Sequence, residues 1–167
     1  MKKFIAAVIM MFSVSTFAQS NSRPQFSYDI SGGVGSYDGN SYSQLQLGLN
    51  WYAYEWLNWR NAAFTQFGST IKTVYGLDSS ILFKTEAYTQ SRSLGVEVFA
   101  GPGVRLASEN SNAGFAQAGI TFQLAGLRLG VGAQALHYWQ DRTDKNDVTM
   151  PRDEMNYFIT IAGGGSF

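Results

Sequence analysis

Hydrophobic and polar residues alternate with a period of two along most of the chain beyond residue 25. Residues 44–51 show the pattern well, because Leu45, Leu47, Leu49 and Trp51 are separated by glutamine, glycine and asparagine. Such alternation is typical of β-strands that have one apolar face. The pattern is weaker in two segments, 58–68 and 80–89. It is clear in six others, at residues 26–34, 44–51, 93–100, 116–124, 127–135 and 155–162. We therefore expect eight strands.

The connections between these segments differ in length. The longer ones are rich in Ser, Asn, Asp and Gly, at 36–43, 69–79, 107–113 and 140–153. The short ones lie near 54–57, 89–92 and 125–126. Long loops at one end and tight turns at the other are typical of outer-membrane barrels, whose long loops face outward. Asn61 breaks the pattern, because it falls on the nominally apolar face of segment 58–68, and we expect a β-bulge or a register shift there.

The first eighteen residues have the parts of a secretory signal peptide. Lys2 and Lys3 give a positive start, and a mostly apolar stretch from Phe4 to Phe17 leads to small residues at a signal-peptidase site ending in Ala18. A membrane-anchoring helix is the alternative, but the apolar stretch is shorter than the roughly 20 residues that a span needs. We predict export and cleavage near Ala18, which makes 1–18 a signal peptide and 19–167 one β-barrel domain.

Two kinds of closed sheet fit alternating strands, and they differ in the direction of the apolar row. A soluble, lipocalin-like barrel turns that row inward around a ligand. A membrane barrel turns it outward to lipid, and its closure satisfies every backbone polar group. Here the second row of each segment holds Gly, Ser, Thr, Gln and isolated charges, which would fill a soluble core poorly. The pattern therefore predicts an all-β, eight-stranded, antiparallel up-and-down transmembrane β-barrel.

Aromatic residues with a polar edge support the membrane alternative. They gather around one short connection and at the end of one segment, as Trp51, Tyr52, Tyr54, Trp56, Trp59, Tyr138 and Trp139. Such rings favour the boundary between membrane and water. Packing within a local core is the alternative explanation for them.

Charge and composition exclude two other classes of protein. Without Lys2 and Lys3 the chain keeps 10 basic residues (12 − 2) against 12 acidic ones, a net charge of about −2. Binding to nucleic acid needs a concentrated basic face, so we expect no nucleic-acid partner. The chain has no cysteine, which excludes disulfides and thiolate metal sites. We expect no cofactor.

Charged residues of both signs are scattered along the predicted inner row. They are Asp29, Arg60, Lys84, Glu86, Glu97, Arg105 and Arg128. Buried charges are costly unless they are paired, so a narrow lumen should hold them as a hydrogen-bonded network. We expect this network to plug and stabilise the barrel, because an eight-stranded interior is just wide enough for side chains to fill. A gated, low-conductance ion path is the alternative.

The segment from Tyr157 to Phe167, together with the leader and the strand spacing, resembles the small OmpA/OmpX-type outer-membrane barrels. The turn from Tyr54 to Arg60 is similar to periplasmic turns of that class. The resemblance implies a place in the bacterial outer membrane, contact with its lipids including lipopolysaccharide, and Phe167 as the signal for the outer-membrane assembly machinery. The chain departs from that pattern at Gly163–Gly165, where large apolar residues usually accompany the final Phe.

One tetrapeptide, beginning at Ser111, resembles part of the serine motif of lipid A deacylases. Such an enzyme uses a histidine two residues before the serine as general base. This chain has Glu109 there, which lacks the near-neutral pKa of imidazole. The single histidine, His137, falls on another segment in its lipid-facing row. Ser111 with Glu109 is thus a weak catalytic candidate, and a polar loop is the preferred interpretation.

Three further features have simple explanations. The charges at 141–154 alternate in sign, which favours a solvated loop over a calcium site. The glycines at 163–165 precede no helix and do not form a phosphate loop. Tyr37, Tyr42 and Tyr75 lie in the expected outer loops and are candidate contacts for an extracellular partner. We expect a structural or loop-mediated role in the cell envelope, with a lipid-modifying enzyme or a low-conductance channel as the alternatives.

Overall fold

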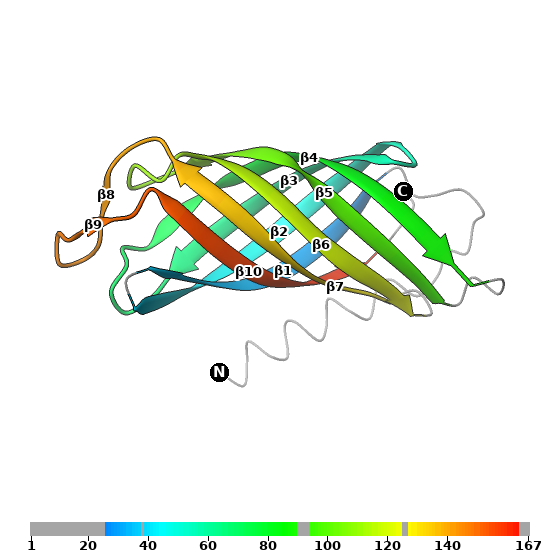
Figure 1. Ribbon diagram of the computed structural model, residues 1–167, viewed down its shortest axis with the longest axis horizontal. Coiled ribbons are helices and arrows are strands. Elements are labelled where there is room, and N and C mark those ends of the chain that lie inside the picture. Colours follow the sequence, from blue (N-terminus) through cyan, green and yellow to red (C-terminus); the bar gives the residue numbers. More distant parts are fainter. Residues whose placement is uncertain (1–25, 38, 90–93, 125–126, 164–167) are drawn as a thin grey trace.

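The structure is a computed structural model that describes residues 26–37, 39–89, 94–124 and 127–163, and these residues form one closed antiparallel β-barrel (Figure 1). The barrel strands are β1 (Phe26–Tyr37), β2 (Asn40–Tyr54), β3 (Leu57–Phe67), β4 (Val74–Tyr88), β5 (Leu94–Ala107), β6 (Ala113–Leu124), β7 (Leu127–Tyr138) and β10 (Asp153–Gly163). Each pairs with its neighbours in sequence, and β10 closes the sheet by pairing with β1 and β7. The predicted eight-stranded antiparallel barrel is confirmed.

The connection between β7 and β10 carries the two-residue strands β8 (Arg142–Thr143) and β9 (Thr149–Met150), which pair with each other beyond the barrel wall (Figure 1). In the described part of the chain, no helix has the length and apolar character to cross a membrane. The predicted signal peptide at 1–18 and the predicted assembly signal Phe167 lie outside the described residues.

The apolar row of each strand faces outward, as the alternation predicts. Leu47 is 57% exposed and Ile159 is 61% exposed, whereas Gln46, next to Leu47 in sequence, is only 6% exposed. A soluble barrel would show the opposite polarity. The exposed apolar side chains therefore form an outer wall suited to acyl chains.

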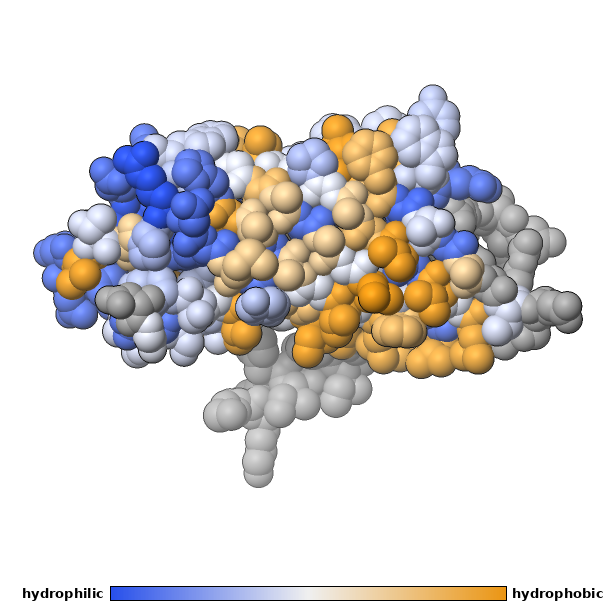
Figure 2. Space-filling model, viewed as in Figure 1, coloured by the Kyte–Doolittle hydropathy of each residue, from blue (hydrophilic) through white to orange (hydrophobic). Residues whose placement is uncertain are grey.

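The outer surface changes character along the barrel. In Figure 2 the hydrophilic surface gathers at the end that carries β8 and β9, and hydrophobic surface covers much of the remaining wall. At the opposite end two groups of rings stack on the outside, Phe26 with Trp51 and Tyr54 with Trp56. Trp59 lies 5.8 Å from Trp51 between ring centroids. This arrangement is that of an aromatic girdle at a membrane boundary.

Three predictions about connections are wrong, and one of them is the expected loop at 69–79, because β4 already begins at Val74. The expected long loop at 36–43 is strand, because β1 runs to Tyr37 and β2 begins at Asn40, which pairs with it. The expected irregularity near Asn61 is absent within β3, where Asn61 pairs in register with Leu49 and Ser79. The register shift lies instead at the turn, between Tyr52 and Tyr54. Asn61 thus faces outward from a regular strand.

A small apolar cluster lies at the end of the barrel that carries the longer connections. Tyr37, Tyr42, Ile71 and Met150 pack together there, each no more than 7% exposed. Tyr37 and Tyr42 were expected to be loop contacts for a partner, and this prediction is wrong, because both point inward from strands. Tyr75 is 63% exposed and remains available at the surface.

Candidate functional site

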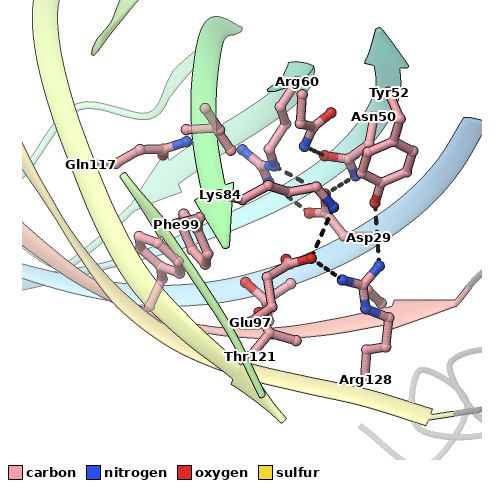
Figure 3. A pocket seen from close by; sticks show the side chains of 15 residues that line it. Asp29, Asn50, Tyr52, Arg60, Lys84, Glu97, Phe99, Gln117, Thr121 and Arg128 are labelled. Atoms are coloured by element: carbon pink, nitrogen blue, oxygen red, sulfur yellow. Dashed lines mark hydrogen bonds and ion pairs between the residues drawn. The ribbon is translucent and has the colours of Figure 1, made fainter. Parts of the chain in front are cut away.

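The turn end of the lumen holds a cluster of three oppositely charged pairs around Lys84, and the two pairs that share Glu97 are seen in Figure 3. The Lys84 Nζ donates hydrogen bonds to Glu86 and Glu97, each at 2.9 Å. Arg128 from β7 donates to the same Glu97 carboxylate and, at 3.3 Å, to the Tyr52 hydroxyl. The Lys84 ammonium also lies 4.2 Å from the centroid of the Tyr52 ring. The structure thus brings together four of the seven charged residues expected in the lumen.

Asp29 and Arg60 form the next pair along the lumen. Arg60 donates two hydrogen bonds to the Asp29 carboxylate, at 2.6 and 2.9 Å, and Asn50 donates a third at 2.7 Å. A bidentate pair of this kind is among the stronger side-chain interactions. Gly48 on β2 makes room for it, because a Cβ there would lie 2.5 Å from an Asp29 oxygen. The glycine of the inner row is therefore part of the site.

A layer of polar side chains crosses the lumen beyond this pair. Arg105, fully buried, makes two hydrogen bonds of 2.7 Å to Asp78. It also donates to Gln44 at 3.3 Å and to Gln134 at 3.1 Å. Gln66 and Asn156 donate to Gln44 in turn. We call this set the cross-lumen layer, and it consists of Gln44, Gln66, Asp78, Arg105, Gln134 and Asn156.

The members of the cross-lumen layer come from six different barrel strands, and each is at most 5% exposed. Asp78 was not among the residues predicted for the lumen, because the sequence around it was assigned to a loop. Its inward direction follows from the parity of Ser80, Leu82 and Lys84 on the same strand. Extending that alternation by one step would have identified the partner of Arg105.

A third polar group lies at the mouth beneath β8 and β9. Arg142 donates to Glu154 at 2.8 Å, and the Tyr42 hydroxyl donates to the other oxygen of the same carboxylate at 2.9 Å. The Arg142 guanidinium lies over the Tyr138 ring. The charges at 141–154 were expected to form a solvated loop, and this is wrong for Arg142, Asp144 and Glu154, which are buried. The pair of Arg142 and Glu154 ties the loop to the barrel, whereas Asp144 accepts hydrogen bonds from the backbone of the loop itself.

A cavity of about 60 Å³ lies in the turn half of the lumen, and Asp29, Lys84, Glu97 and Arg128 help to line it (Figure 3). Its volume is large enough for a few water molecules. The Nε of Arg128 and the Oδ1 of Asn58 have no hydrogen-bond partner among the described residues. One is a donor and the other an acceptor, so the cavity suits solvent better than it suits an ion of either sign.

The hydroxyl of the weak catalytic candidate Ser111 bonds to the backbone rather than to the carboxylate of Glu109, although both residues line one small pocket. The Ser111 hydroxyl is buried and donates to the backbone carbonyl of Glu109 at 3.2 Å. His137 lies on the outer face of β7, where its Nδ1 is 2.7 Å from the Asp153 carboxylate. The structure therefore does not bring Ser111 and His137 together. Among the described residues, no three His, Asp or Glu side chains form a group that could hold a metal ion.

An antiparallel eight-stranded barrel with an apolar outer wall and a polar, filled lumen has the architecture of the small outer-membrane β-barrels. No protein-family model and no curated protein matches the chain.

Two solved structures of this class resemble it in fold. One is described as the crystal structure of the outer membrane enzyme PagL, with 19% sequence identity, 82% of this chain and 99% of that chain covered, and a TM-score of 0.55. The other is Neisserial surface protein A (NspA), with 13% identity, 87% and 100% coverage, and a TM-score of 0.57. At such identities the likeness establishes the fold alone.

Proposed function

We propose that the chain is an outer-membrane β-barrel of the cell envelope that has a structural or loop-mediated role and a closed lumen. The observation that supports this most is the cross-lumen layer, in which buried side chains from six strands bond to one another across the barrel. An eight-stranded barrel leaves little space beyond its own side chains. Such a layer leaves no evident path for solute.

The chemistry of the lumen agrees with a structural role. The charges that face the cavity bond mainly to each other, as in the pairs Asp29–Arg60 and Glu97–Arg128. A catalytic acid, base or nucleophile needs to be accessible to a substrate. The ion pairs in the lumen instead offset the cost of burying charge inside the membrane. Outer-membrane lipids, including lipopolysaccharide, and the assembly machinery are the partners that this role implies.

Planar-bilayer recording tests the closed lumen. We expect the purified, folded protein to give no steady conductance, and Glu97→Gln and Arg128→Gln to leave the bilayer equally silent. A reproducible conductance that changes in either variant would instead favour the ion path. Electrophoresis of heated and unheated membrane fractions gives the control for folding, because a compact barrel shifts in mobility.

The alternative of a lipid-modifying enzyme has little support from the geometry around Ser111. The hydroxyl donates to a backbone carbonyl, and the loop residue Glu109 supplies that carbonyl rather than its carboxylate. A serine nucleophile needs a base within hydrogen-bond reach. We expect Ser111→Ala to leave any release of acyl chains from lipopolysaccharide unchanged, as measured by mass spectrometry of the lipid. A loss of acyl release in Ser111→Ala would instead support the lipid-modifying enzyme.

A further inference from the structure

Asn61 is a polar side chain on the lipid-facing wall of β3. It points outward between Leu49 on β2 and Ser79 on β4, in the middle of a regular strand. Leu45, Leu47 and Leu49 continue the outward row of β2 beside it. The position is thus surrounded largely by apolar wall, and no local irregularity explains an amide there.

The depth of Asn61 places it inside the apolar band. It follows Trp59 of the aromatic girdle by two residues and precedes Phe67, at the other end of β3, by six. With the rise and tilt usual for barrel strands, it lies roughly 5 Å from the first and roughly 15 Å from the second along the membrane normal. An apolar band about 25 Å tall includes this depth.

The Asn61 amide makes no hydrogen bond to any other described residue. Its neighbour Ser79 already accepts the indole N–H of Trp59 at 2.9 Å. Acyl chains offer neither donors nor acceptors, so an unpartnered amide at this depth is costly. Polar side chains inside a membrane are rare and usually pair with other protein groups.

We propose that this wall, formed by Asn61, Ala63 and Ser79 with Leu77 beside them, is the interface between two copies of the chain in the membrane. An asparagine amide carries a donor and an acceptor, so two copies related by a two-fold axis satisfy each other with reciprocal hydrogen bonds. The small residue Ala63 follows it on the outer row of β3 and lets two walls approach closely there, as small residues do where helices meet in membranes. The surrounding leucines supply the apolar contact.

The absence of cysteine from the chain makes disulfide cross-linking a clean test. Ala63→Cys places a thiol on the proposed interface and keeps Asn61 intact. Ala133→Cys is the matched control, because Ala133 is the same number of residues from the turn end of its strand and β7 lies on the opposite wall of the barrel. Both proteins would be purified, reconstituted into phospholipid vesicles and oxidised. We expect a disulfide-linked dimer with Ala63→Cys and little with Ala133→Cys.

The contribution of the amide is tested by adding Asn61→Leu to Ala63→Cys. We expect self-association to weaken by about tenfold, the size that one or two polar contacts have in membranes. The heat-dependent mobility shift should persist, since leucine suits a lipid-facing wall. Equal dimer yields at positions 63 and 133, or a yield unchanged by Asn61→Leu, would overturn the proposal. Cross-linking to another protein in native membranes, without dimer in vesicles, would overturn it in favour of a different partner.

Discussion

At the scale of single residues, the pair of Asp78 and Arg105 is the most deeply buried ion pair among the described residues. Both side chains are at most 1% exposed, and two short hydrogen bonds join them. Asp78→Ala would leave a buried guanidinium without its counter-charge, which we expect to lower the free energy of unfolding by about 3–5 kcal/mol. Equilibrium unfolding of the vesicle-embedded protein in guanidinium measures this change.

The control for that prediction removes both charges. Replacing the pair with Asp78→Leu and Arg105→Met should restore most of the lost stability, because apolar side chains of similar volume often replace a buried ion pair at little cost. Asp141→Ala, at an exposed loop position, should change the stability by less than about 0.5 kcal/mol. A double variant as unstable as Asp78→Ala would mean that polar contacts, rather than charge balance, hold the layer.

The turn at Glu109 and Asn110 stores backbone strain. Their φ angles are +55° and +56°, in the left-handed region that asparagine tolerates better than glutamate. Glu109→Gly should therefore stabilise the folded protein, by about 0.5–1 kcal/mol after the entropy cost of glycine is subtracted. Asn110→Gly should be closer to neutral. Unfolding curves of the two variants compare them directly, and a destabilised Glu109→Gly would show that the glutamate side chain has an unrecognised contact.

At the scale of elements, the alternation of apolar and polar residues predicted the strands wherever one row faces lipid. It failed to predict the parts of the strands that continue past the apolar outer wall. At the β1–β2 hairpin, Ser36, Ser41 and Ser43 face outward while Tyr37 and Tyr42 face inward. The outward row is polar and the inward row is aromatic there, which is the opposite of the pattern in the rest of the barrel. The sequence therefore suggested a loop. Asp78 and Glu154 were missed because the sequence around each was assigned to a loop, although the alternation of β4 continued by one step from Ser80 gives the inward direction of Asp78. The pairing of charges within the predicted lumen set could be expected, whereas the pairing of Glu154 with Arg142 depends on the path of the loop between them.

The loop that carries β8 and β9 should owe its closed position to Glu154. The side chain of Arg142 is 4% exposed in its pair with Glu154, whereas that of Arg152 is 52% exposed. Trypsin added outside intact cells should therefore cleave after Arg152 more readily than after Arg142. Glu154→Ala should release Arg142 and make it a cleavage site, as mass spectrometry of the peptides would report. Asp141→Ala, which removes only the exposed partner of Arg152, should leave Arg142 protected.

At the scale of the whole molecule, the ends of the apolar wall fix where the protein sits in the bilayer. Three of the four tryptophans, Trp51, Trp56 and Trp59, lie at the turn end, and Trp139 directly follows β7 at the loop end. All four are at least 38% exposed on the outside. Because indole prefers the interface, both groups should lie at membrane depths close to the headgroups. This placement also puts Asn61 between the two boundaries.

Fluorescence quenching by brominated lipids measures these depths. In variants that keep only Trp56 or only Trp139, with phenylalanine at the other three positions, bromine near the glycerol should quench more strongly than bromine near the chain ends. A tryptophan introduced at Leu47, on the middle of the β2 wall, should show the reverse order, because its side chain points into the acyl region. If Trp139 were quenched like position 47, the membrane boundary would lie further toward β8 and β9. The mouth that Arg142 and Glu154 close would then lie within the bilayer, and their ion pair would be a barrier inside the membrane rather than a cap above it.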